Sequence, residues 1–333
     1  MKHPELEISR RVGVCGCKHT TRDLIRALVR GGYEIDHCIT IGPQLAEIQR
    51  VAGYCDLRPF LEQLGVPYTI ARSYSLESQE DRHRIPALQL DMLLVTGWQR
   101  LIPPWLLGNL AIGAFGMHGS FKPLPHGRGR SPMNWSLILN RTEFFTHLFR
   151  YSPTADDGPV VGEQIFSITP HDTAKTLHYK NVVAMSQLCL RHLPDLIAGH
   201  AKLRAQPQEG ICYFPKRTEE DGLVYWSDTV TDIYNLIRAV TRPFHGAYTY
   251  LDDDEGKKVV LWRAIPFDTH LRWPGAAVGE VIEVFDGGEL LVRAGDFTLL
   301  VQEFQGVEPS EELVGRRFGH LGIPRKNWGE LPR

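Results

Sequence analysis

Short apolar runs alternate with helix-like segments through the first 120 residues, and this alternation constrains the fold more than any other feature. Between the runs, TTRDLIRALVRGG (20–32) spaces Leu24, Ile25 and Leu28 at helical intervals and contains a terminal glycine pair. The apolar runs stand at RVGVCG (11–16), VPYTIA (66–71), LDMLLVTGW (90–98) and IGAFGMH (112–118). Strands that alternate with helices predict a parallel sheet with helices on both faces.

The second half of the chain has a different pattern. AKLRAQPQEG (201–210) is polar and contains proline, which is typical of a domain boundary. Beyond it we expect a helix at 230–240 and five short strands separated by Gly/Asp turns, which fit a small barrel of the OB type. The strands are HGAYTYL (245–251), KVVLWRA (258–264), GEVIEVF (279–285), ELLVRAG (289–295) and FTLLVQEFQ (297–305). The predicted organisation is an α/β Rossmann-like domain (1–206), an OB-type β-barrel domain (207–305) and a tail without a clear element (306–333).

Charge and cysteine content restrict the class of partner. The 37 lysines and arginines do not outnumber the 39 aspartates and glutamates, so no overall basic field indicates a nucleic-acid partner. Cys15 and Cys17 lie inside an apolar run without a second cysteine pair, so we expect buried thiols rather than a zinc site. The N-terminus lacks the apolar core of a signal peptide and no stretch reaches transmembrane length, so a cytoplasmic protein is expected.

The strongest functional signal is the loop GAFGMHGSFKPLPHGRGRSP (113–132). His118 stands between two glycines that allow close backbone approach to a ligand, and prolines and arginines follow it. A histidine satisfied by structural hydrogen bonds is the alternative, but it does not explain this concentration of special backbone residues. Because His118 follows a strand of the predicted parallel sheet, we expect a ligand site there.

This loop resembles the motif of the N10-formyltetrahydrofolate-dependent formyltransferases, which runs Asn-x-His-Gly-Ser-Leu-Leu-Pro, then Arg-Gly-x-x-Pro, then Trp. The Asp-x-Gly of that family is similar to Asp156-Asp157-Gly158. YFPKRTEEDGLVYWS (213–227) and LIRAVTRPFHGAYTYLD (236–252) resemble the second domain of methionyl-tRNA formyltransferase and of the formyltransferase half of the bifunctional aminoarabinose enzyme. The resemblance covers roughly residues 11–305.

The resemblance implies roles for particular residues. Formyl transfer needs a base for the attacking amine and donors for the charge that develops on the formyl oxygen. His118 matches the base or donor, and Asp156 matches the carboxylate that orients it. Asp157 is then a turn residue, although the adjacent pair leaves the choice open. The residues that match the binding site of the formyl donor N10-formyltetrahydrofolate are Arg100, Leu101, Ile102, Arg130, Ser152, Pro153, Thr154, Ala155 and Asp156; Leu101 and Ile102 would also fit a packing role. No metal is expected.

The sequence departs from the family motif two residues before the histidine, where Gly116 replaces the catalytic asparagine. Loss of one donor to the oxyanion costs roughly 3–4 kcal/mol in barrier height. Three explanations stay open. Another amide, with Asn134 the nearest candidate, replaces the asparagine; backbone amides near 116–118 or a water do so; or the protein is slow or inactive.

The expected function is therefore N-formylation of the amine of a nucleotide-linked amino sugar. GWQRLIP and RGRSP resemble the sugar enzymes more than the tRNA enzymes, and the charge balance lacks the basic excess that phosphate contacts with tRNA favour. The alternatives are methionyl-tRNA formyltransferase and a non-catalytic relative that binds folate or a nucleotide sugar. A nucleotide sugar is the expected partner, without nucleic acid or membrane, and a homodimer is compatible with the sequence.

Overall fold

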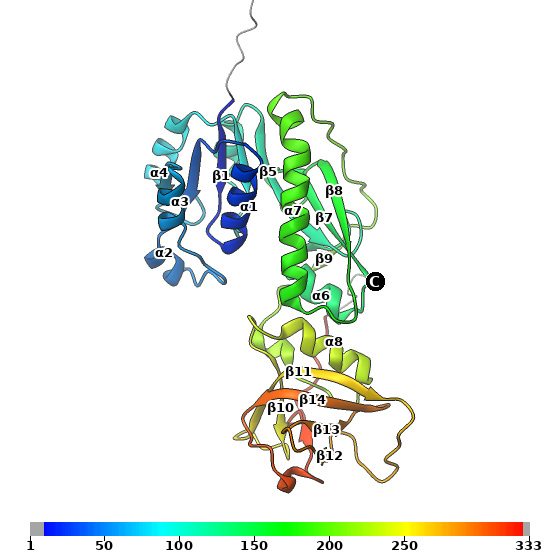
Figure 1. Ribbon diagram of the computed structural model, residues 1–333. Coiled ribbons are helices and arrows are strands. Elements are labelled where there is room, and N and C mark those ends of the chain that lie inside the picture. The colour runs from blue at the N-terminus through cyan, green and yellow to red at the C-terminus, as the bar shows by residue number, and fades with distance from the viewer. Residues whose placement is uncertain (1–9, 329–333) are drawn as a thin grey trace, which may run out of the picture. The chain divides into compact units, whose positions relative to one another are not determined.

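The computed structural model describes residues 10–328 and divides into two compact units (Figure 1). Of these residues, the first unit contains 10–128, Phe145–Phe166 and Lys180–Ile211. The second unit contains Gly129–Phe144, Ser167–Tyr179 and 212–328. The predicted domain limits at 206 and 305 remain predictions.

A seven-stranded sheet organises the N-terminal half, in the order β3-β2-β1-β4-β5-β7-β8. The first five strands in this order are parallel, as predicted from the alternation of strands and helices. The strands are β1 (Val12–Cys15), β2 (His37–Thr40), β3 (Tyr68–Ile70), β4 (Met92–Val95), β5 (Gly113–Ser120), β7 (Glu143–Arg150) and β8 (Val160–Ser167).

Helices cover both faces of this sheet. On one face, α1 (His19–Arg30) buries Leu24, Ile25 and Leu28 against the strands, because these side chains share one side of the helix. Leu61 of α3 (Arg58–Leu64) and several residues of α7 (Ala174–Ile197) join the same core cluster, and α1 and α7 lie side by side in Figure 1. The opposite cluster includes residues of α2 (Pro43–Ile48) and α5 (Pro104–Gly108), together with Ile85, which directly follows α4 (Gln79–Arg84).

Strand β5 continues past the parallel part of the sheet. Its first four residues pair with β4, whose last residue, Val95, lies opposite Gly116. From Phe115 to Ser120 it pairs with β7 in the antiparallel direction, and His118 lies opposite His147. His118 therefore lies inside β5, not just past its end as the sequence had suggested. His118 still lies beyond the carboxyl end of β4, on the side of the sheet where α/β proteins bind ligands.

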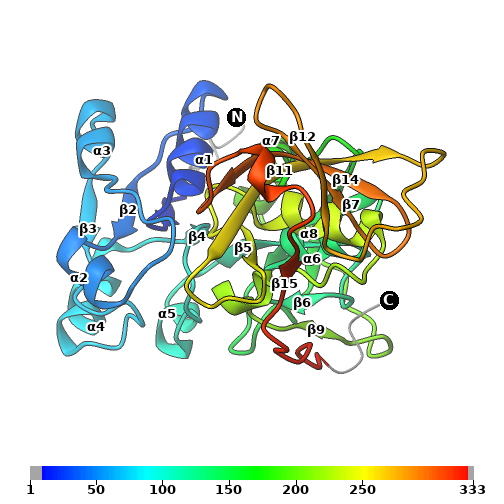
Figure 2. The same ribbon diagram turned by 90° about the horizontal axis from the view of Figure 1, so that it is seen from below.

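The C-terminal half forms a curled antiparallel sheet of six strands, in the order β12-β13-β14-β11-β10-β15. All five predicted strands are present, and α8 (Val230–Val240) packs against β10, β11 and β14, as Figure 2 lets the reader follow. The tail beyond residue 305 was expected to lack a clear element, but its β15 (Phe318–Gly319) pairs with β10. The other strands are β10 (Ala247–Leu251), β11 (Lys258–Asp268), β12 (Val281–Val284), β13 (Leu290–Arg293) and β14 (Thr298–Gln305).

The remaining elements are short. Strand β6 (Arg128–Gly129) pairs with β9 (Tyr213–Phe214), and α6 (Pro132–Ile138) packs against α8. Three 3-10 helices span Pro86–Leu88, Glu219–Gly222 and Glu311–Leu313. Across residues 10–328, no helix combines the length and hydropathy that crossing a membrane requires.

Candidate active site

His118 is held between two oxygen atoms at the carboxyl side of the sheet. Its Nε2 lies 2.8 Å from the carbonyl oxygen of Gly127, and its Nδ1 lies 3.5 Å from Oδ2 of Asp156. The two side chains therefore meet in space, as the sequence analysis expected. A neutral imidazole can donate to only one of these oxygens, whereas a protonated ring can donate to both. The carboxylate of Asp156 is thus placed where it can orient the imidazole.

The loop that follows β7 holds Asp156 in place. Asp156 adopts a left-handed backbone conformation (φ 56°), which aspartate tolerates better than most residues. The neighbouring carboxylate of Asp157 instead accepts hydrogen bonds from the hydroxyls of Ser152 and Thr154. Burial raises the pKa of Asp157, but these hydroxyls together with Arg128 outweigh that effect, so its pKa lies below the usual value. The ambiguity between the two aspartates resolves geometrically, because Asp156 faces His118 and Asp157 binds its own loop.

Gln206 fastens this loop to the histidine loop. Its amide nitrogen donates to the carbonyl oxygens of Asp156 (2.8 Å) and Gly158 (2.7 Å). Its amide oxygen accepts from Nε (3.2 Å) and Nη2 (2.7 Å) of Arg128. Gln206 and Arg128 are both buried, so these bonds lie out of water, where an unpaired group is costly. The sequence does not indicate this role, because Gln206 stands in a polar segment that is typical of a domain boundary.

His147 is a second buried histidine that the sequence analysis did not single out. Its Nε2 accepts from the backbone N–H of Leu124 (3.2 Å), so its Nδ1 carries the proton and donates to the carbonyl oxygen of His118 (3.2 Å). Burial, together with the charges of His118 and Arg204, lowers the pKa of His147 to about 4, although the bond to the His118 carbonyl opposes this. His147 is thus a neutral side chain that links the backbone of His118 to the backbone of Leu124.

The residues predicted to contact the formyl donor lie in three places. Arg100 follows β4, places its guanidinium 4.8 Å from the ring centre of Tyr74, and donates to Gln49 (3.2 Å). Leu101 is 56% exposed and is therefore available to a ligand, whereas Ile102 is buried in the core cluster under the sheet. The segment Ser152, Pro153, Thr154 and Ala155 is partly or fully exposed in the loop that carries Asp156.

Arg130 and Asn134 belong to the second unit, unlike His118 and Asp156. Arg130 is exposed, and its backbone N–H donates to the carbonyl of Phe214 (3.0 Å). Asn134 is buried on α6, and its amide nitrogen donates to the carbonyl of Ala239 (2.6 Å). One of its N–H donors is therefore already engaged. The catalytic role of Asn134 and the binding role of Arg130 remain predictions.

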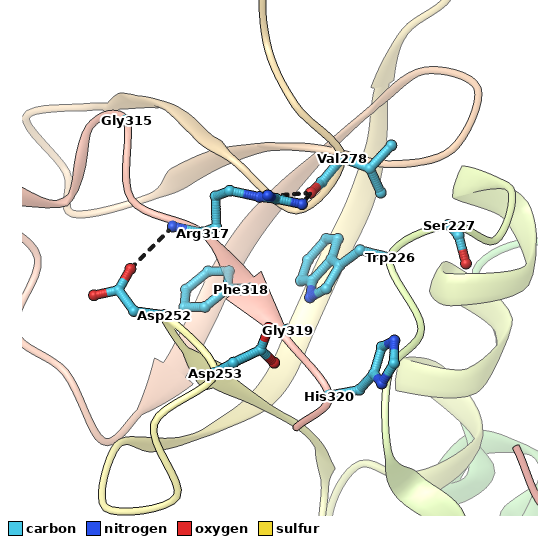
Figure 3. Close-up of a pocket in the computed structure, with 10 residues that line it drawn as sticks. All are labelled: Trp226, Ser227, Asp252, Asp253, Val278, Gly315, Arg317, Phe318, Gly319 and His320. Carbon is cyan, nitrogen blue, oxygen red and sulfur yellow. Dashed lines mark hydrogen bonds between the residues drawn. The ribbon is translucent and has the colours of Figure 1, made fainter. Parts of the chain in front are cut away.

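The second unit contains a cavity of about 560 Å³ that none of the predicted site residues line (Figure 3). Trp226 and Phe318 stack in its wall, with ring centres 5.7 Å apart. Its arginine, Arg317, donates to the carbonyl of Val278 through the guanidinium and to Asp252 through the backbone N–H. Arg317, Val278 and Asp252 of this cavity are thus engaged with one another.

The cysteines take structural positions. Cys15 and Cys17 are buried, as expected, and burial raises the pKa of both thiols. Within residues 10–328, no group of three or more His, Cys, Asp and Glu side chains is arranged to hold a metal ion.

The sheet order and the His118–Asp156 pair are those of an α/β protein that binds its ligand beyond the carboxyl ends of parallel strands. The family described as formyl transferase matches residues 16–192, just over half of the chain, and the formyl transferase C-terminal domain matches residues 216–310. The chain therefore belongs to the formyl transferase family, whose members are enzymes that transfer formyl groups.

Solved structures share this fold at low sequence identity. An N-formyltransferase from Helicobacter canadensis, in complex with folinic acid and dTDP-3-aminofucose, is 15% identical, with 88% of this chain and 99% of that chain covered and a TM-score of 0.61. A sugar N-formyltransferase from a Shewanella species is 18% identical, with coverages of 79% and 99% and a TM-score of 0.57. HypX from Aquifex aeolicus, in complex with tetrahydrofolic acid, is 17% identical, with coverages of 91% and 45% and a TM-score of 0.60.

Proposed function

We propose that this protein is an N-formyltransferase that moves the formyl group of N10-formyltetrahydrofolate to the amine of a nucleotide-linked amino sugar. The observation that carries the proposal is the approach of His118 and Asp156 to 3.5 Å, in a chain of the formyl transferase family. The ligands named for the Helicobacter canadensis protein, folinic acid and dTDP-3-aminofucose, support both the donor and the acceptor class.

The chemistry follows from the two side chains. The acceptor amine nitrogen forms a bond to the formyl carbon, and the bond from that carbon to N10 of the folate breaks. One proton leaves the acceptor nitrogen and one is delivered to N10, so no oxidant or reductant is needed. His118 takes up the proton, and Asp156 orients the ring and stabilises its charged form. His147 and the carbonyl of Gly127 keep His118 in place during the transfer.

The formyl donor would bind along the carboxyl ends of β4 and β5. Arg100 supplies an exposed cation beside the aromatic ring of Tyr74, and the exposed 152–155 segment supplies backbone groups. A flat pteridine with a hydrogen-bonding edge suits such strand-end backbone. The side chain of Ile102 is almost fully buried, so its part in the donor site would come from its backbone groups.

The net charge of the chain favours an amino-sugar acceptor, and turnover with candidate acceptors tests this choice. The net charge of −2 lacks the basic excess that favours the phosphates of tRNA. A panel of nucleotide-linked amino sugars and charged initiator tRNA, assayed by folate absorbance, separates the candidates. We expect turnover with at least one sugar; robust activity on tRNA with none on any sugar would reject the proposal in favour of methionyl-tRNA formyltransferase. Absence of turnover with every acceptor would favour a non-catalytic binding relative.

For the C-terminal half we propose an OB-type barrel within a domain of residues 207–305, after a catalytic domain of residues 1–206. The two edges of the curled sheet are linked, since the N–H of Val281 donates to Arg316 (2.9 Å) and that of Phe318 donates to Gly279 (2.8 Å). This linkage supports closure of the sheet into a barrel. Expression of residues 207–305 as a cooperatively unfolding fragment would support these limits. A fragment that folds only when it is extended through β15 to residue 328 would count against the limit at 305.

A further inference from the structure

The space beside Gly116 is filled by the side chain of Tyr151, the residue that follows β7. A Cβ atom placed on Gly116 would lie 2.3 Å from each of Cε1, Cζ and Oη of Tyr151. Real Cβ atoms do not approach other atoms so closely. The hydroxyl end of Tyr151 therefore occupies the room that a side chain at position 116 would need, which explains why this position is glycine.

Tyr151 is fixed in this place by its surroundings. It follows β7 directly, and its backbone N–H donates to the carbonyl of Ala114 (2.8 Å). Its ring packs against Phe149, with ring centres 5.2 Å apart, and against the cluster that contains Leu124. A phenol held in this way loses little further freedom when it donates to a ligand.

The hydroxyl of Tyr151 lies on the same side of the sheet as the base. Gly116 and His118 are two residues apart in β5, so positions 116 and 118 face the same side. Among the residues that the structure describes, none forms a hydrogen bond with the Tyr151 hydroxyl. Burial, followed by the nearby charge of Asp156, raises the pKa of this phenol well above its usual value. It therefore keeps its proton and remains a donor.

We propose that the hydroxyl of Tyr151 donates a hydrogen bond to the formyl oxygen during transfer, in place of the asparagine amide that the family motif carries two residues before the histidine. This inference rests on the proposed formyl transfer. As the acceptor nitrogen bonds to the formyl carbon, the oxygen gains negative charge; it loses that charge when the bond to N10 breaks. Tyr151 keeps its proton throughout, while His118 takes the proton of the amine.

Tyr151→Phe tests the hydroxyl while the ring and its packing stay. We expect kcat to fall by about 10²–10³, the scale associated with one oxyanion donor. KM for the acceptor and the Kd of 5-formyltetrahydrofolate, measured by calorimetry, should change less than about threefold, because the donated bond strengthens only as charge develops. Tyr33→Phe is the matched control, since Tyr33 precedes β2 at the opposite end of the strands. An unchanged kcat in Tyr151→Phe would overturn the proposal.

An exchange of roles between positions 116 and 151 gives a second test. Gly116→Asn alone should lose activity, because its side chain collides with the phenol. Tyr151→Ala alone should also lose activity, because the donor is gone. The double variant Gly116→Asn/Tyr151→Ala places an amide in the vacated space and should exceed Tyr151→Ala by at least about tenfold in kcat. A folded double variant no faster than Tyr151→Ala would contradict the exchange.

The outcomes separate this inference from the proposed function. If the natural protein formylates no amino sugar, the acceptor proposal fails. The rate of formyl transfer to water, measured as formate release without acceptor, can then be compared between the natural protein and Tyr151→Phe. A natural protein that releases formyl to neither would overturn both. Asn134→Ala, checked for folding by circular dichroism, tests the competing donor. A large loss of kcat there with full activity in Tyr151→Phe would assign the role to Asn134.

Discussion

His118 is the residue on which the proposed chemistry depends most. His118→Ala removes the group that takes up the proton, so we expect kcat to fall by about 10²–10⁴, the range associated with a positioned base. His83→Ala, an exposed histidine on α4, is the matched control and should keep full activity. Initial rates at saturating donor and acceptor provide the measurement. A His118→Ala variant within about threefold of the natural rate would remove His118 from the mechanism.

His147 should make the protein less stable in acid. Its pKa of about 4 in the fold lies below the 6.5 of an unfolded histidine, so the unfolded chain binds a proton first as the pH falls. Stability is fully present above pH 6.5 and declines as the pH falls toward 4, by about 3 kcal/mol from this residue. Urea unfolding at several pH values measures how the free energy of unfolding changes with pH. The natural protein and the control His83→Gln should show the same decline toward low pH, and His147→Gln should show a smaller one. Equal slopes in all three proteins would contradict the account.

At the level of single residues, sequence motifs identified some of the site and missed the rest. His118 and Asp156 could be paired in advance, because each stands in a distinctive local motif. Tyr151 could not, since its relation to Gly116 arises from the register of β5 beside β7. Asn134 was the nearest amide in sequence, yet its side chain bonds to Ala239 of α8.

At the level of elements, Gln206 connects the 151–158 loop to the strand that carries Arg128. Gln206→Ala removes buried bonds to two carbonyls and a guanidinium, so we expect a loss of about 2–4 kcal/mol in unfolding free energy. Hydrogen exchange should quicken in residues 151–158, and KM for the formyl donor should rise. Gln208→Ala is the control, because Gln208 is exposed.

Gln206→Glu refines this test. It keeps an acceptor for Arg128 but replaces the donors that serve Asp156 and Gly158 with a second oxygen. We expect fast exchange in the loop in this variant too, with less loss of stability than in Gln206→Ala. Slow hydrogen exchange of residues 151–158 in both variants would show that the conformation of this loop does not depend on Gln206.

The elements that sequence predicted best are those with strong periodicity. The parallel strands, α1 and α8 follow from continuous apolar runs or amphipathic spacing. The extension of β5 and the two-residue strand β15 were missed, because pairing with β7 and β10 creates them. Short strands have almost no signal in the local sequence, because pairing with strands far away in the chain determines whether they form.

At the level of the whole molecule, the family assignment and the proposed acceptor class depend on different observations. The two formyl transferase domain matches together span most of the chain from 16 to 310. The acceptor depends on the charge balance and on what proteins of similar fold bind, and neither the cavity near Arg317 nor the curled sheet has a property that selects one sugar. The approach of His118 to Asp156 was predictable from sequence, whereas the choice of sugar requires a direct assay.

The most direct test of the central claim follows the formyl group itself. The protein would be incubated with N10-formyltetrahydrofolate labelled with carbon-13 in the formyl group and with a nucleotide-linked amino sugar. Carbon-13 NMR would then locate the label. We predict a signal from a new amide on the sugar nitrogen with the natural protein and almost none with His118→Ala. Label that stays on the folate or appears only as formate, with every sugar tested, would contradict formyl transfer to an amino sugar.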